Sequence, residues 1–331
     1  MMSEKLILGV DVGGTKIAAA VVTDEGKVIS RGYGSTSAQA GPQVVIDNIF
    51  ATINKAISSS NVVLSQLSGI GIAAAGIIDS KNGKVIFSPN LPGWHEVSLG
   101  DAVHQRFNVS TYLGNDASLA ALGEWRFGVK KQVANLIYIT VSTGIGGGII
   151  CNGKPYTGVL GVAGEVGHMT IDVNGPRCNC GNVGCWETLA SGTALAREAV
   201  KHIKEGASTS IVEFAGGDLT KVDAKVVFEA AKQGDKLANQ LIARLGYYLG
   251  VGLANLVNIF NPELILIGGG VAKMGDLLLK PAIKVVKERA FTTSATSVQI
   301  RPALLGDDSS ILGAVAFVLD NLAEGSTIHG D

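Results

Sequence analysis

The sequence predicts an α/β fold with two lobes of mixed sheet, each flanked by helices, and a cleft between the lobes. The chain has 331 residues, which suits two domains with substantial cores. Strand-like runs recur in two antiparallel meanders, and each meander opens with a turn of small residues. Helical and strand-like segments follow both meanders, so the two lobes are predicted to share one design.

The first meander begins at the start of the chain. Residues 6–10 form a buried strand by composition, and a second apolar run covers residues 17–22 after the turn at 11–16. A third run starts at Lys27. Because the first strand leads into a turn and another strand, and not into a helix, this opening differs from that of dinucleotide-binding folds.

The same order returns in the middle of the chain. A strand at residues 136–141 meets a glycine-rich loop at 142–148, followed by an apolar run at 149–151 and the turn Asn152-Gly153. Helices are expected over residues 44–58, 192–205, 223–233, 235–260 and 310–322, and further strands over 69–73 and 264–267. The repeated order indicates a weak internal duplication.

Two such lobes resemble the arrangement of the actin-like ATPase superfamily, whose domains have a ribonuclease H-like fold. By that resemblance, residues 1–116 and 310–331 form a smaller N-terminal lobe, and residues 117–309 form a larger C-terminal lobe. The last helix is then expected to pack back on the first lobe.

Composition excludes several classes of function. Apolar residues make up 47% and charged residues 17% of the chain, which is typical of a compact globular protein. The formal net charge of −1 provides no basic field for phosphate backbones or anionic lipids, so we expect neither nucleic acid nor a membrane as a partner. The apolar region 250–272 is interrupted by asparagines and a proline, and no secretory signal is recognised, so the protein is expected to be cytoplasmic.

The turn between the first two strands has the character of a phosphate-binding hairpin. It consists of Asp11, Gly13, Gly14, Thr15 and Lys16 around one valine, and its glycines let backbone N–H groups approach an anion. A Walker loop is excluded because the threonine precedes the lysine and no helix follows. The competing interpretation is a tight hairpin that needs glycine for a positive φ.

A second glycine-rich loop strengthens the nucleotide interpretation. Thr143 can offer a hydroxyl to the same anion, and Gly144 and Gly146 belong to a run with more glycines than one turn needs. Gly268, Gly269 and Gly270 follow a continuous apolar strand and leave a flat backbone for an adenine or a ribose. A strand that simply ends at a glycine turn is the alternative for this last run.

Three closely spaced cysteines point to a metal. Cys178, Cys180 and Cys185 lie within eight residues, and intervening glycines permit the bends that aim three thiols at one centre. His168 provides a fourth ligand for tetrahedral zinc. A structural histidine and a disulfide between two of the thiols are the competing interpretations. Cys151 stands apart, and its role is left open.

These motifs together resemble the ROK family (repressors, open reading frames and kinases). The family signature matches residues 141–168 with their glycines, the cysteine knuckle at 178–187 and the hairpin at 11–16. The family comprises glucokinases, fructokinases, N-acetylmannosamine kinases and sugar-responsive repressors, and this chain is most similar to the glucokinases. The resemblance implies ATP and Mg²⁺, a structural Zn²⁺, and a homodimer or homotetramer.

The resemblance also implies roles for individual residues. Asp116 is the catalytic base, which accepts the proton of the attacking sugar hydroxyl, and Asp11 orients magnesium through water. The sugar-contacting positions are Gly76, Asn90, Asn115, Asp116, Glu165, His168 and Glu187. Without the resemblance, Asp116 would be interpreted as a helix N-cap, Asn90 as a turn residue and Glu187 as a solvated acid at a helix start.

The predicted function is therefore transfer of a phosphoryl group from ATP to glucose, giving glucose 6-phosphate and ADP. Fructose, mannose and N-acetylmannosamine are alternative acceptors, and the use of polyphosphate as a donor is left open. A repressor of the family normally carries a helix-turn-helix domain ahead of this fold, and only five residues precede the first strand here, which disfavours that role. An ATPase without a sugar acceptor is disfavoured by the knuckle and the pocket carboxylates.

Overall fold

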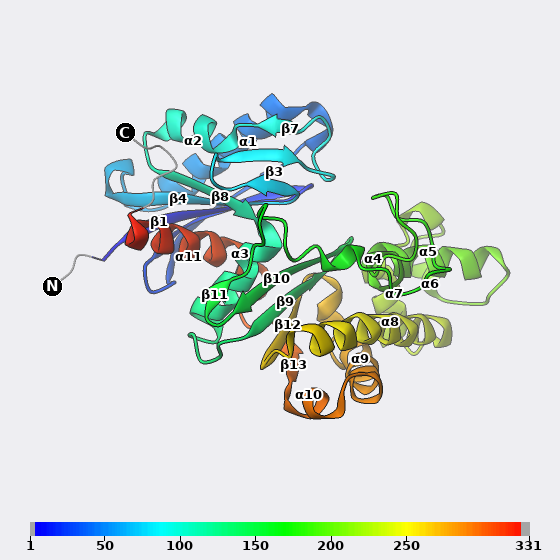
Figure 1. Cartoon of the computed structure of the whole chain (residues 1–331). Coiled ribbons are helices and arrows are strands. Elements are labelled where there is room, and N and C mark those ends of the chain that lie inside the picture. The colour runs from blue at the N-terminus through cyan, green and yellow to red at the C-terminus, as the bar shows by residue number, and fades with distance from the viewer. Residues whose placement is uncertain (1–3, 326–331) are drawn as a thin grey trace. The chain divides into compact units, whose positions relative to one another are not determined.

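The computed structural model describes residues 4–325 and divides into two compact units (Figure 1). The first unit contains the residues up to Ala134, the segment Gly148–Gly164 and the residues from Leu304 onwards. The second contains Asn135–Gly147 and Glu165–Ala303. The chain therefore passes between the units more than once, as it does when a terminal helix returns to the first lobe.

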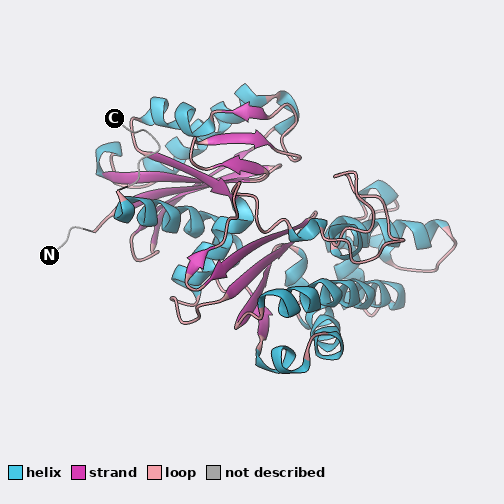
Figure 2. Ribbon diagram, in the orientation of Figure 1, coloured by secondary structure: helices cyan, strands magenta, loops and turns pink. Residues whose placement is uncertain are grey.

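The first unit is built on a five-stranded sheet in the order β3-β2-β1-β4-β8 (Figure 2). β1 pairs antiparallel with β2 and parallel with β4, and β4 pairs parallel with β8. The strands are β1 (Leu6–Val12), β2 (Lys16–Thr23), β3 (Val28–Ser35), β4 (Leu67–Ala74) and β8 (Thr111–Asn115). The predicted antiparallel opening is confirmed.

The second five-stranded sheet has the order β11-β10-β9-β12-β13. β10 pairs antiparallel with β11, while β9 with β12 and β12 with β13 are parallel. The strands are β9 (Leu136–Val141), β10 (Ile145–Cys151), β11 (Lys154–Pro155), β12 (Leu264–Gly268) and β13 (Gln299–Pro302). The order repeats that of the first sheet strand for strand, which confirms the internal duplication and the actin-like ATPase fold.

Helices cover both faces of the first sheet. On one face, Val10 of β1 packs with Ile49 of α1 (Pro42–Ser58) in a cluster that also includes residues of α2 (Leu99–Phe107). On the other face, Ile7 packs with Val315 of α11 (Ser309–Glu324), drawn in red in Figure 1. Alternate residues of β1 are thus buried on opposite faces, as expected for a covered strand. The last helix packs on the first unit, as predicted.

A small sheet and several helices complete the two units. The small sheet in the first unit consists of β5 (Ile77–Asp79), β6 (Lys84–Phe87) and β7 (His95–Val97). The helices of the second unit are α4 (Glu187–Ala190), α5 (Gly192–Lys204), α6 (Ile211–Phe214), α7 (Ala224–Lys232), α8 (Lys236–Phe260), α9 (Asp276–Arg289) and α10 (Thr292–Ser297). Among the helices of residues 4–325, none is both long and apolar enough to cross a membrane.

Helices α3 and α11 of the first unit touch through their backbones. A Cβ atom at Gly313 of α11 would lie 1.8 Å from the carbonyl oxygen of Leu119, and one at Gly123 would lie 2.5 Å from that of Ser309. α3 (Asp116–Gly123) continues as one π-helical turn over Glu124–Gly128. Only glycine permits this contact, because any side chain would push the helices apart.

The buried Glu124 joins the end of α3 to the start of α11. Its carboxylate accepts hydrogen bonds from the backbone N–H groups of Leu304 (3.0 Å) and Leu305 (2.9 Å) and from the hydroxyl of Ser309 (2.7 Å). The side chain is fully buried, and these donors replace the water that an ionised carboxylate would otherwise require. The position of α3 relative to α11 is therefore fixed both by the backbone contact at Gly123 and Gly313 and by the Glu124 carboxylate.

We expect Gly313→Ala to lower the free energy of unfolding by about 3 kcal/mol, because the added methyl group overlaps the Leu119 carbonyl. Urea unfolding followed by circular dichroism measures the change. Gly270→Ala is the matched control, since its φ is −62° and no atom would lie within 4 Å of the new methyl group. Equal stability of the two variants would contradict the close helix contact.

Candidate functional site

Two carboxylates stand at the same edge of the first sheet. Asp11 is near the end of β1, and Asp116 follows β8, with β4 between these parallel strands. Burial, together with the charge of Asp116, raises the pKa of Asp11 to about 7 although Lys16 acts to lower it. Burial also raises the pKa of Asp116. Like charges in a desolvated site are typical of catalytic centres and are seldom retained for stability.

The residue that caps α3 is Asn115, not Asp116. The Asn115 side-chain oxygen accepts a hydrogen bond from the Ser118 N–H at 3.0 Å, and its amide donates to the Gly76 carbonyl at 3.2 Å. Asp116 is the first residue of the helix, where its Oδ1 accepts from the Ala117 N–H at 2.9 Å. The capping role considered for Asp116 is therefore wrong.

The hairpin between β1 and β2 is tight, but its glycines do not have a positive φ. The Gly13 N–H donates to the Lys16 carbonyl at 3.1 Å, and the Thr36 hydroxyl donates to the Gly13 carbonyl at 2.6 Å. A Cβ atom at Gly14 would lie 3.2 Å from the Cβ of Asn90. Glycine is therefore required by close approach of the loop that carries Asn90, and not by turn conformation.

The exposed side of this hairpin is polar. Thr15 and Lys16 are both exposed, and the Lys16 ammonium lies 4.5 Å from the centroid of the Tyr33 ring. Asn90 is exposed as well, in the turn that precedes β7. The hairpin thus presents a hydroxyl and a cation to solvent, two donors that suit an oxyanion.

The second glycine-rich loop is shorter than predicted. Ser142 donates its N–H to the Gly144 carbonyl at 2.9 Å, and β10 begins at Ile145. Gly146 therefore lies in the strand and not in the turn, so the expected loop at 142–148 is corrected to residues 142–144. Thr143 is exposed, and its carbonyl accepts from the Thr193 hydroxyl at 2.8 Å, which ties the turn to α5.

Two glycines of this region serve packing. A Cβ atom at Gly148 would lie 2.4 Å from the Ala117 carbonyl of α3, and one at Gly144 would lie 2.6 Å from a carboxylate oxygen of Glu187.

In the glycine run at the end of β12, Gly268 is packed against the Tyr138 hydroxyl and Gly269 has a φ of +85°. Gly269 thus has the conformation of a glycine turn, whereas Gly268 ends β12 and Gly270 is exposed, with open space around it.

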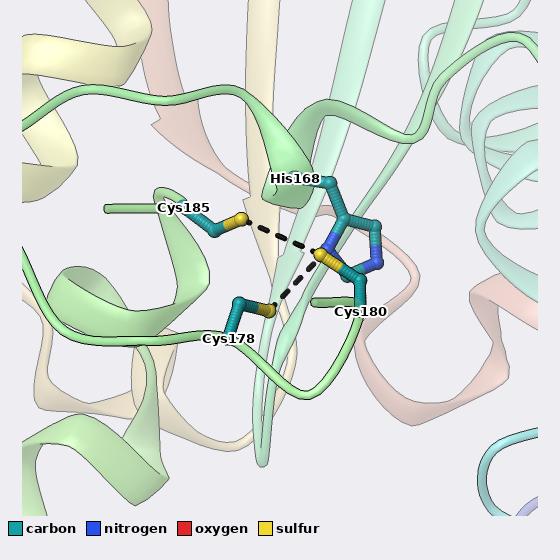
Figure 3. Close-up of side chains that lie close together, drawn as sticks. All are labelled: His168, Cys178, Cys180 and Cys185. Atoms are coloured by element: carbon teal, nitrogen blue, oxygen red, sulfur yellow. Dashed lines mark hydrogen bonds between the residues drawn. The ribbon is translucent and has the colours of Figure 1, made fainter. Parts of the chain in front are cut away.

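The cysteine knuckle folds as a compact loop. The Cys178 N–H donates to the Asn182 carbonyl at 2.8 Å, and the Gly181 N–H donates back to the Cys178 carbonyl at 3.0 Å. Gly181 and Gly184 have φ values of +93° and +69°, which side chains rarely adopt. These turns bring the three thiols to one side of the loop (Figure 3).

The structure brings the predicted metal ligands together. The ligand atoms of His168, Cys178, Cys180 and Cys185 all lie within 4.8 Å of one another. The Cys180 and Cys185 sulfurs are 3.7 Å apart, as are the Cys178 sulfur and Nδ1 of His168. Tetrahedral zinc with Zn–S bonds of about 2.3 Å requires sulfurs about 3.8 Å apart, so the donor set fits zinc.

Glu187 and Glu165 flank the ring of His168. The Cys178 thiol donates to Oε1 of Glu187 at 3.2 Å, and the same oxygen lies 3.7 Å from Nδ1 of His168. The other ring nitrogen, Nε2, lies 3.9 Å from Glu165. Burial raises the pKa of the Cys178 thiol to about 12, so without a cation it remains a neutral donor. Glu187 is thus an acid at the start of the short helix α4 (Glu187–Ala190), as the alternative had it, but its side chain is only 24% exposed and is held by the knuckle.

Residues outside any motif secure this segment. Trp186 is fully buried, and its indole N–H donates to the Tyr248 carbonyl of α8 at 2.9 Å. A Cβ atom at Gly252 would lie 2.1 Å from the indole, so α8 has a glycine where the ring enters. Arg197 donates to the Thr188 carbonyl at 2.6 Å. Both bonds flank Glu187, and no spacing in the sequence indicates them.

Comparisons with known proteins agree with this geometry. Residues 7–321 match the ROK family. The glucokinase of Halalkalibacterium halodurans is 39% identical over 94% of both chains. The xylose repressor of Caldicellulosiruptor bescii is 34% identical over 96% of this chain and 78% of its own. The structure of a ROK family glucokinase from Streptomyces griseus with glucose and AMPPNP is 36% identical, covers 95% of this chain and 99% of its own, and superposes with a TM-score of 0.85.

Proposed function

The chain belongs to the ROK family, and we propose that it is a glucokinase, which transfers the γ-phosphoryl group of ATP to the 6-hydroxyl of glucose. It is a sugar kinase, since glucokinases at well above 30% identity match it over nearly its whole length. The observation that carries the proposal is the pair of partly buried carboxylates beside the hairpin after β1, because sugar phosphorylation needs a base next to a phosphate site. Glucose is chosen on the identity of these relatives.

We assign Asp116 as the general base. Its carboxylate stands in the first turn of α3 with one oxygen on the Ala117 N–H, which leaves the other to accept the proton of the sugar hydroxyl. Burial favours the protonated form, so the carboxylate binds that proton more strongly than an exposed aspartate would. By accepting this proton, the Asp116 carboxylate assists the attack of the sugar hydroxyl on the γ-phosphorus. In this assignment the phosphoryl group passes directly to the sugar.

The hairpin residues are assigned to ATP. Backbone N–H groups near Gly13 and Gly14, the Thr15 hydroxyl and the Lys16 ammonium can all donate to phosphate oxygens. Magnesium, bound with ATP, supplies positive charge to the phosphate oxygens during transfer. Asp11 orients the hydrated ion. Thr143, Gly144, Gly146, Gly268, Gly269 and Gly270 are proposed to offer further backbone and hydroxyl donors or open space for the nucleotide in the second unit. Gly270 is exposed with open space around it, whereas Gly268 and Gly269 are closely packed.

The sugar contacts are assigned within each unit. In the first unit, the Gly76 backbone, Asn90 and Asn115 are proposed to bind ring hydroxyls, and the bond between Asn115 and Gly76 supports a shared role. In the second unit, Glu165, His168 and Glu187 are proposed to do so, since a carboxylate oxygen of each glutamate lies within 4 Å of a ring nitrogen of His168. Carboxylates and amides accept and donate in fixed directions, which suits a pyranose.

Zinc is proposed as a structural ion on His168 and the three cysteines. When bound, it supplies the positive charge that keeps buried thiols ionised. Nδ1 of His168 then faces the metal, and Nε2 is directed to the sugar side, where Glu165 lies. The knuckle orients both the imidazole and the segment that carries Glu187.

The acceptor is tested by coupled ADP release with glucose, mannose, fructose and N-acetylmannosamine, with ATP or polyphosphate as donor. We expect the highest kcat/KM with glucose and ATP, because the glucokinase relatives match the whole chain. A preference for another hexose would replace glucose within the same chemistry. ATP turnover that ignores added sugar would contradict the proposal.

Asp116→Asn should retain ATP and sugar binding but lose turnover by about 10²–10⁴-fold, because the amide cannot accept the hydroxyl proton. Calorimetric titrations and steady-state kinetics separate the two effects. Asp47→Asn, on the exposed face of α1, is the matched control. Near-normal turnover of Asp116→Asn would refute the assignment of the base.

Cys180→Ala should release the metal and weaken sugar binding more than ATP binding, since the knuckle no longer holds His168 and Glu187. Mass spectrometric metal analysis is expected to find about one zinc per wild-type chain and much less in the variant. Cys151→Ala, an exposed thiol outside the cluster, should retain the wild-type zinc content. Unchanged sugar affinity in a metal-free variant would disprove the coupling.

A further inference from the structure

The second unit contains a pocket that the proposed kinase chemistry does not use. Its volume is about 310 Å³, and its walls come from the segment that starts at Asp172, from α5 and from α8. Volumes of this order are typical of sites for small ligands. None of the residues assigned to the sugar, ATP or zinc lines it.

The lining combines an apolar floor with two guanidinium groups and the carboxylates of Asp172 and Glu198. Leu195 and Leu241 are buried there, and Arg197 and Arg244 stand at the wall with about half of each side chain exposed. A guanidinium offers five N–H donors, so one or two contacts leave further donors for a ligand. A compact apolar body with an anionic group is complementary to this arrangement.

The two arginines are weakly held by their shared acid. Glu198 lies 3.5 Å from Nη1 of Arg244 and 3.7 Å from Nε of Arg197. Charge-assisted hydrogen bonds of full strength are about 2.7–2.9 Å long, so both contacts are loose. Because about half of each arginine side chain is exposed, solvent weakens these ion pairs, and an arriving carboxylate or phosphate can compete with Glu198 for the guanidinium donors.

The pocket wall is bonded directly to the segment that carries Glu187. Arg197 donates to the Thr188 carbonyl at 2.6 Å, and the carbonyl of Tyr248 accepts the indole N–H of Trp186 at 2.9 Å. Thr188 and Trp186 are the two neighbours of Glu187 in the chain. A ligand that reorients Arg197 or Tyr248 therefore acts on the backbone on both sides of that carboxylate.

We propose that this pocket binds a small organic anion, a carboxylate or a phosphate ester with an apolar body, and that its occupancy changes sugar affinity through Thr188 and Trp186. The effect on the sugar rests on the proposed role of Glu187, whereas binding of the anion does not. The anion is held by Arg197 and Arg244 and its body packs on the leucine floor. Linkage requires that sugar change the affinity for the anion by the same factor.

Isothermal titration of the zinc-loaded protein tests the site with phenyl phosphate and benzoate, in the presence of a saturating non-hydrolysable ATP analogue. Benzyl alcohol, which lacks the charge, and inorganic phosphate, which lacks the apolar body, are the reference ligands. We expect at least one of the two aromatic anions to bind at least about tenfold more tightly than both references. Phenyl phosphate and benzoate also distinguish a phosphate site from a carboxylate site.

Arg244→Gln should weaken binding of that anion by about tenfold or more, and Arg301→Gln, an exposed arginine of β13 outside the pocket, should not. Arg197→Gln should in addition reduce the effect of the anion on sugar affinity. Absence of saturable binding, or binding that Arg244→Gln leaves unchanged, would overturn the proposal. Failure of kinase activity alone would not, because the anion titration requires no turnover.

Discussion

The backbone contact between α3 and α11 is the constraint on which the first unit depends. Gly123 and Gly313 let the two helices touch, and the buried Glu124 carboxylate ties the end of α3 to the chain that starts α11. Asp116 is the first residue of α3. A small displacement of the helix would therefore move that carboxylate, and rates of group transfer are sensitive to such displacements.

In the second unit, Glu187 and His168 lie on short turns and loops, and not on long helices or strands. Three sets of contacts hold these segments in place. The knuckle brings together the four side chains proposed as zinc ligands, the buried Trp186 donates a hydrogen bond to α8, and Arg197 donates one to the Thr188 carbonyl. Polar groups on irregular backbone are thus held by a compact loop and a buried ring, where the first unit uses sheet edges and helix packing.

Much of the fold and of the candidate site could be predicted from the sequence, because these parts depend on patterns among residues that are close together in the chain. The strands at 6–10 and 136–141 and the knuckle depend on composition and spacing that neighbouring residues reveal. The end of the second glycine loop could not be predicted, since Gly148 is indistinguishable from a turn residue until its close contact with α3 is seen. Asn115 caps α3 through an N–H only three residues on, but its bond to Gly76 and the clamp at Glu124 depend on partners far along the chain, which no local pattern records.

The repeated strand order has a consequence for how such a protein diversifies. In the first sheet a modest connection joins β3 to β4, whereas the connection from β11 to β12 carries the knuckle, the helices α4 to α8 and the pocket beside α5 and α8. The two aspartates lie on the strands and the helix start of the first unit, outside this longer connection. Substitutions within the longer connection can therefore change the knuckle and the pocket without changing the strands that position the two aspartates.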